Sequence, residues 1–131
     1  MKKTVLMLTI MLYASQLYAS DTILECTCSK SVLITSKGTD GVVVDSKKEK
    51  GVKIIFAALD TDTPKMKGTL GESTLKVVKR EQTILWLSEE PELGGINVWT
   101  IYFEVGMFTC SKQYSLESGK PLGVMLMGYC K

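Results

Sequence analysis

The segment that decides the fold class of this chain is INVWTIYFEV, residues 96–105. Every second residue from position 99 onward is apolar: Trp99, Ile101, Phe103 and Val105. A period of two is the repeat of a β-strand, because successive side chains of a strand point to opposite faces of its sheet. We therefore expect a strand over these residues, with that apolar set facing the core.

Similar short runs, rich in Val, Ile, Thr and aromatic residues, cover the chain from residue 21 onward. No stretch keeps a helical period for ten residues, and clusters of Gly, Pro and Asp separate the runs as turns require. The predicted strands are residues 23–35, 42–45, 52–59, 73–79, 83–87, 96–105, 108–115 and 122–130. This pattern predicts an all-β fold, an antiparallel meander forming either a small barrel or a two-layer sandwich.

The beginning of the chain predicts a secretory signal peptide. Two lysines precede an apolar run, residues 4–13, that is too short to span a bilayer, and Ala19 provides a small-residue cleavage site. We expect a signal peptide over residues 1–19 and a single β domain over residues 20–131, located in the periplasm or secreted.

The charge balance argues against two classes of partner. Without Lys2 and Lys3 the 16 basic residues fall to 14, which equals the number of acidic residues. A neutral chain lacks the excess of positive charge that nucleic-acid binding requires. No second apolar stretch reaches the roughly 18 residues of a membrane helix, so we expect neither nucleic acid nor a membrane span.

Four cysteines in an exported chain predict two disulfides. Cys26 and Cys28 lie two residues apart on one predicted strand, nearly 7 Å between Cα atoms, which is at the limit of disulfide geometry. Their partners are then Cys110 and Cys130, in either order. Each bridge would close a long loop and contribute on the order of 4 to 5 kcal/mol to the free energy of unfolding.

No catalytic motif stands out, and the chain has no histidine, the residue most often used as a general base or metal ligand. We therefore predict no catalytic residue, no cofactor and no bound metal, and a protein that is not an enzyme. A less favoured alternative is a four-thiolate zinc site, or a copper site made by Cys26 and Cys28 with help from Met125 and Met127.

An acidic loop is the predicted partner-binding site, since loops on a rigid scaffold often carry recognition. Its residues are Glu89, Glu90, Glu92 and Leu93. A basic hairpin, with lysines at positions 47, 48, 50 and 53, is the weaker candidate, because such charges often only keep a sheet edge soluble.

The chain resembles the small secreted β proteins of Gram-negative bacteria that neutralise cell-wall hydrolases, namely periplasmic lysozyme inhibitors and toxin immunity proteins. The resemblance rests on the signal before Ser20, the short strands, and a cysteine near each end at Cys26 and Cys130. It implies an inhibitor or immunity protein that blocks a secreted or periplasmic hydrolase or toxin by occlusion.

Other functions stay open. A lipocalin-like barrel carrying an apolar ligand would need aromatic residues such as Phe56, Trp86, Trp99 and Phe103 around a cavity of about 300 Å³ or more. A structural envelope protein is a further alternative. An uncovered edge strand could also pair with the same strand of a second copy, so a homodimer is possible.

Overall fold

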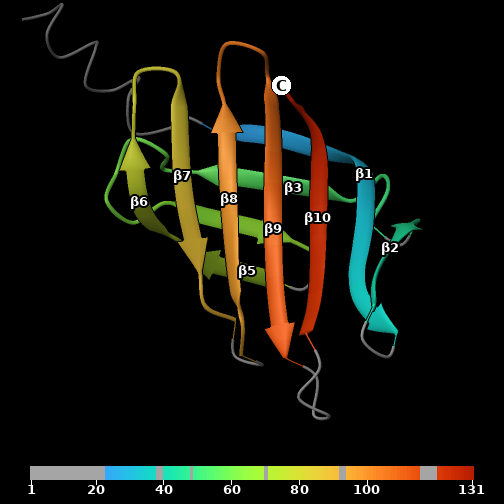
Figure 1. Cartoon of the computed structure of the whole chain (residues 1–131). Helices are drawn as coiled ribbons and strands as arrows, with labels where there is room; N and C mark the ends of the chain where they lie inside the picture. The colour runs from blue at the N-terminus through green and yellow to red at the C-terminus, as the bar shows by residue number, and fades with distance from the viewer. Residues whose placement is uncertain (1–22, 38–39, 48, 70, 92–93, 116–120) are drawn as a thin grey trace, which may run out of the picture.

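The computed structural model describes residues 23–37, 40–47, 49–69, 71–91, 94–115 and 121–131 (Figure 1). In these ranges the chain forms ten strands and no helix. The strands are β1 (Leu24–Lys37), β2 (Asp40–Ser46), β3 (Lys53–Ala57), β4 (Lys65–Gly68), β5 (Gly71–Thr74), β6 (Lys76–Arg80), β7 (Ile84–Glu89), β8 (Ile96–Tyr102), β9 (Met107–Ser115) and β10 (Pro121–Cys130).

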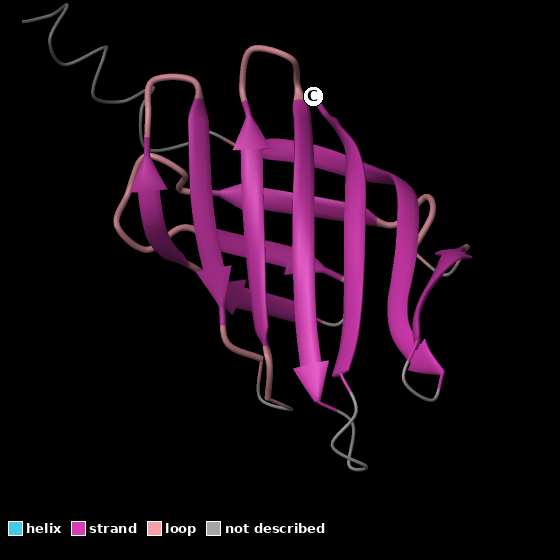
Figure 2. Ribbon diagram, in the orientation of Figure 1, coloured by secondary structure: helices cyan, strands magenta, loops and turns pink. Residues whose placement is uncertain are grey.

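All ten strands belong to one antiparallel sheet with the order β5-β4-β3-β1-β10-β9-β8-β7-β6, and β2 pairs with β1 outside this path. Figure 2 shows that β6 to β10 form one layer, while β3, β5 and the first part of β1 cross behind it at a steep angle. The sheet nearly closes into a barrel. Because the described chain consists of strands and contains no helix, the all-β prediction is confirmed. No helix that could cross a membrane occurs in the described part of the chain.

Strand β1 joins the two layers. Its first residues pair with β3, and its later residues, from Ser31 onward, pair with β2. A bulge between Cys28 and Lys30 interrupts its pairing with β10, which runs beside both parts. A bulge bends a strand and increases its twist, and β1 accordingly turns from the back layer to the side of β10 (Figure 1).

The core fills the space between the layers. Two rows of paired residues point inward from β7 to β10: Leu85, Ile101, Phe108 and Gly128, then Leu87, Trp99, Cys110 and Leu126. Phe56 of β3 meets the ring of Trp99 edge to face, with 5.6 Å between ring centroids. This inward pattern is the period of two that the sequence predicts for Trp99 and Ile101.

The predicted core set of residues 96–105 is wrong at its far end. Phe103 is 42% exposed and Val105 is 65% exposed, because β8 ends at Tyr102 and residues 103–106 form the turn to β9. Gly106 in this turn has a φ of 60°, a conformation that glycine adopts without strain. The apolar period therefore continues beyond the strand itself.

Two further strand predictions differ from the structure. β4 (Lys65–Gly68) was not expected, since only Met66 in it is a large apolar residue. The predicted strand 73–79 is two strands, β5 and β6, because the buried Leu75 lies between them and its N–H donates to the carbonyl of Pro64. Leu75 therefore connects β5 and β6, the two strands at opposite ends of the sheet.

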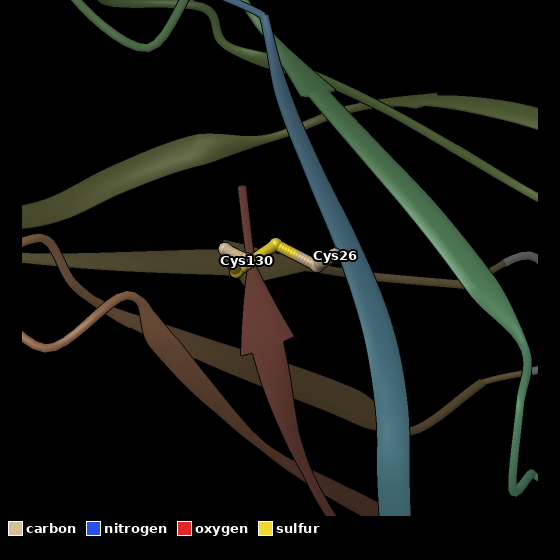
Figure 3. Close-up of a disulfide and its surroundings, with 2 residues drawn as sticks. All are labelled: Cys26 and Cys130. Atoms are coloured by element: carbon tan, nitrogen blue, oxygen red, sulfur yellow. A yellow bond between two sulfur atoms is a disulfide. The ribbon is translucent and has the colours of Figure 1, made fainter.

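One disulfide, between Cys26 and Cys130, closes a sequence separation of 104 residues (Figure 3). The two residues are direct cross-strand partners on β1 and β10. The second predicted bridge is absent: Cys28 and Cys110 are buried free thiols. Strand β10 lies between β1 and β9, which separates their backbones by two strand spacings, about 10 Å and beyond disulfide reach.

This thiol assignment predicts a specific alkylation pattern. Burial raises the pKa of both the Cys28 and the Cys110 thiol, so little thiolate is present for reaction with iodoacetamide near pH 8. The folded protein should stay unmodified, whereas the unfolded, unreduced protein should gain two carbamidomethyl groups by mass spectrometry. An unfolded protein that gains none would instead mean that a second disulfide forms.

Candidate functional site

The outward side of β7 to β10 carries no charged residue over three paired rows. The rows are Ile84, Tyr102, Met107 and Tyr129; Trp86, Thr100, Thr109 and Met127; and Ser88, Val98, Ser111 and Met125. Directly paired residues project to the same side of a sheet, so these rows alternate with the buried inward rows. We call these twelve residues the outer face.

The exposed part of the outer face lies on β10, while Thr100 on β8 is only 7% exposed. Tyr129 is 60% exposed, Met125 46% and Met127 43%, while Trp86 is half-buried. The Lys79 ammonium lies 5.2 Å from the centroid of the Trp86 ring, a cation–π contact at the β6 side. Lys30 of β1 is the cross-strand partner of Met127 on the other side. An uncharged face is thus flanked by lysines.

An open hollow of about 680 Å³ adjoins the outer face at the Pro121 end of β10. Ile34, Ile96, Gly123 and Met125 are among its lining residues. Gly123 on β10 pairs with Gln113 of β9 on one side and with Ile34 of β1 on the other. The middle strand of these three, β10, therefore has no side chain at this position. The hollow therefore gives the otherwise flat sheet surface a depression.

A second cavity, of about 270 Å³, lies inside the barrel where β7 ends and β8 begins. Glu89, Asn97 and Lys112 line it and are direct cross-strand partners on β7, β8 and β9. The Glu89 carboxylate accepts hydrogen bonds from Asn97 Nδ2 at 3.1 Å and from Trp99 Nε1 at 3.5 Å. These bonds hold the carboxylate inside the barrel mouth.

Of the predicted acidic loop the structure describes Glu89 and Glu90, which lie in different surroundings. Glu89 points into the barrel cavity, whereas Glu90 is exposed, and Glu92 and Leu93 lie outside the described residues. Glu89 is thus partly buried at the barrel mouth, while the prediction that this loop binds a partner stays a prediction.

The four aromatic residues expected around an apolar ligand do not meet around one cavity. Phe56 is fully buried, Trp86 lies on the outer face and Phe103 is exposed in a turn, so only Trp99 lines the barrel cavity. The cavity volume is also slightly below the 300 Å³ expected for a carrier of this kind.

The alternative metal site is also not assembled. Cys26 is in the disulfide and Cys28 faces the core, while Met125 and Met127 point outward from β10. Across the described residues, no three His, Cys, Asp or Glu side chains form a group that could hold a metal ion.

Sequence reasoning missed the two features that stand out most in the structure. Asn97 lies two residues before Trp99 on the same strand, so a strict period of two places both side chains on the inward face. The alternating residues Met125, Met127 and Tyr129 in the last strand were a signal of an apolar outward row. Their cross-strand neighbours, and hence the uncharged face, depend on strand order, which the sequence does not reveal.

Comparison with protein-family models, with curated proteins and with solved structures found no match to this chain.

Proposed function

We propose that this protein is a secreted, periplasmic protein-binding module that inhibits a cell-envelope-degrading enzyme or toxin by occlusion. The observation that carries the proposal is the uncharged outer face of β7 to β10. The protein would cover the active-site entrance of its partner with this face, and no chemistry of its own would be needed.

The composition of the outer face supports this use. The centres of protein–protein interfaces are depleted of charge and enriched in Tyr, Trp, Phe and Met. The outer face combines Trp86, Tyr102 and Tyr129 with three methionines and is free of charge. Residues that contribute most to binding are often Trp and Tyr, so Trp86 and Tyr129 are the expected anchors.

The size of the outer face suits the centre of an interface. Four strands about 4.8 Å apart and three rows about 6.7 Å apart give a patch on the order of 400 Å² once side-chain width is included. Four of the twelve residues, Ser88, Thr100, Thr109 and Ser111, carry hydroxyl groups, so the apolar part of this patch is smaller. A complete interface buries about 800 Å² per partner, so the rim and the hollow beside Gly123 would supply the remainder.

The flanking charges indicate the chemistry of the partner. Lys30 lies on one side of the outer face, and Lys79, which also forms an ion pair with Glu81, lies on the other, so Lys30 is the less compensated of the two charges. A partner with acidic groups around an apolar centre would complement them, which raises the association rate and fixes the orientation of docking. The sheet backbone is already ordered by cross-strand hydrogen bonds, so binding would lose less conformational entropy than binding through a mobile loop.

A surface variant tests the proposal. Met127→Ser combined with Tyr129→Ser should lower affinity for the partner at least about tenfold, since interface centres of this kind lose 1 kcal/mol or more on truncation. The partner is first captured from the secreted and envelope fractions of the same species by native mass spectrometry, and its enzymatic activity is then measured with and without the protein.

Ile23→Ser combined with Val44→Ser is the matched control. Both residues are exposed, but Ile23 precedes the part of β1 that pairs with β3, and Val44 lies on β2 opposite Leu33, so neither borders the outer face or lines the hollow. The control should bind and inhibit as the wild type does. Equal inhibition by the face variant and the control would contradict the proposal, as would capture of a second copy of this chain only.

A further inference from the structure

We propose that the cavity inside the barrel mouth binds a small organic cation, a primary ammonium group attached to an apolar chain. This site is separate from the outer face, and the inference does not depend on the function proposed above. It rests on the charge of the cavity lining, on one buried polar atom that has no hydrogen-bond partner in the described part of the chain, and on the apolar side chains of the lining.

The charged groups of the cavity lining are mainly acidic. Glu49, Glu72 and Glu89 contribute carboxylates, and Lys112 contributes one ammonium. Glu72 is partly compensated by Lys65, whose Nζ lies 3.8 Å from its carboxylate at an exposed position. The remaining balance is negative, and a confined negative site attracts a cation.

Asn97 provides the second, independent observation. The residue is only 5% exposed and lines the cavity. Its Nδ2 donates to Glu89, but its Oδ1 has no hydrogen-bond partner among the described residues. An unpaired buried carbonyl destabilises the fold by about 1 to 3 kcal/mol, and a ligand ammonium that reaches it after a small side-chain rotation would remove that penalty.

Glu89 would provide the charge for the same ammonium group. The hydrogen bonds that it receives from Asn97 and Trp99 both end on Oε2, and among the described residues no hydrogen bond to its other oxygen is found, so that oxygen can accept from a ligand. An ammonium carries three N–H donors, which matches the Glu89 carboxylate together with Asn97 Oδ1. Charge-assisted hydrogen bonds of this kind are about twice as strong as neutral ones.

The rest of the lining suits an apolar chain. Ile54, Met66 and Leu126 line the cavity beside the Trp99 ring. Asn97 on β8 pairs with Glu89 of β7 on one side and with Lys112 of β9 on the other. The Lys112 Nζ lies 5.9 Å from the centroid of the Trp99 ring. Its positive charge opposes a bound cation, so it is expected to limit affinity and not to bind the ligand.

Calorimetric titration of the mature, oxidised protein with hexylamine and with hexanoate tests the site. Hexylamine should bind and hexanoate should not. Glu89→Gln, which keeps an oxygen to accept from Asn97 and Trp99, should weaken hexylamine binding about tenfold or more. Glu90→Gln is the matched control, because Glu90 is exposed and does not line the cavity.

A second variant makes the result independent of any folding defect in Glu89→Gln. Lys112→Met should strengthen hexylamine binding, since it removes the opposing charge. Absence of hexylamine binding, equal affinity for hexanoate, or weaker hexylamine binding by Lys112→Met would each overturn the inference.

Discussion

Replacing Cys26 and Cys130 together with alanine is expected to lower the free energy of unfolding by about 4 to 5 kcal/mol. The bridge closes a sequence separation of 104 residues and joins the first and last strands of the described chain. In the chain-entropy model, a cross-link of this length strongly restricts the unfolded ensemble. Urea denaturation of the oxidised proteins measures the difference.

Two controls separate the bridge from the loss of a buried side chain. Cys28→Ala removes a buried thiol that has no bridge and should lower stability by only about 1 kcal/mol. Dithiothreitol should destabilise the wild type but leave the double variant unchanged. A double variant within about 1 kcal/mol of the wild type would show that the bridge contributes little.

Gly128→Ala is the substitution with the next largest expected effect, a loss of about 3 kcal/mol or more. A Cβ at this position would collide with the carbonyl oxygen of Thr27 and lie 2.5 Å from Cε1 of Phe108. The Thr27 oxygen belongs to the neighbouring strand, so it cannot move without disturbing the pairing of β1 with β10. Urea denaturation again provides the measurement.

Gly123→Ala is the matched control on the same strand. Its nearest contact would be the Cβ of Ile34 at 3.5 Å, an ordinary van der Waals distance. The substitution should change stability by no more than about 1 kcal/mol, and alanine's smaller unfolded-state entropy acts in its favour. Similar stability of the two variants would mean that β1 and β10 leave room for a methyl group at Gly128, contrary to this packing.

The fold class follows from local pattern, and the differences follow from tertiary context. Trp99 and Ile101 alternate into the core as the sequence predicts, but the same alternation continues through Phe103 and Val105 into a turn. Periodicity describes which side a residue would face in a strand, while the end of the strand is set by where its neighbours stop pairing. The choice of barrel over sandwich likewise depends on the bend of β1 at its bulge.

The candidate sites were harder to predict because both are assembled across strands. Glu89 lies in an acidic stretch that suggested an exposed loop, yet β7 extends to include it and turns its carboxylate inward. Met127 and Trp86 are 41 positions apart in sequence but lie in one outward row. The sequence allows two partners for Cys26, and only the register of β1 with β10 selects Cys130.

Oxidative footprinting of methionines tests the central claim, that the outer face binds a protein partner, most directly. Met125 and Met127 are exposed on this face, whereas Met66 is buried in the core and serves as the internal reference. Hydrogen peroxide should oxidise the two exposed methionines in the free protein and leave them unmodified in the complex with the captured enzyme. Equal oxidation of Met125 and Met127 in the free protein and in an inhibited complex would contradict the account.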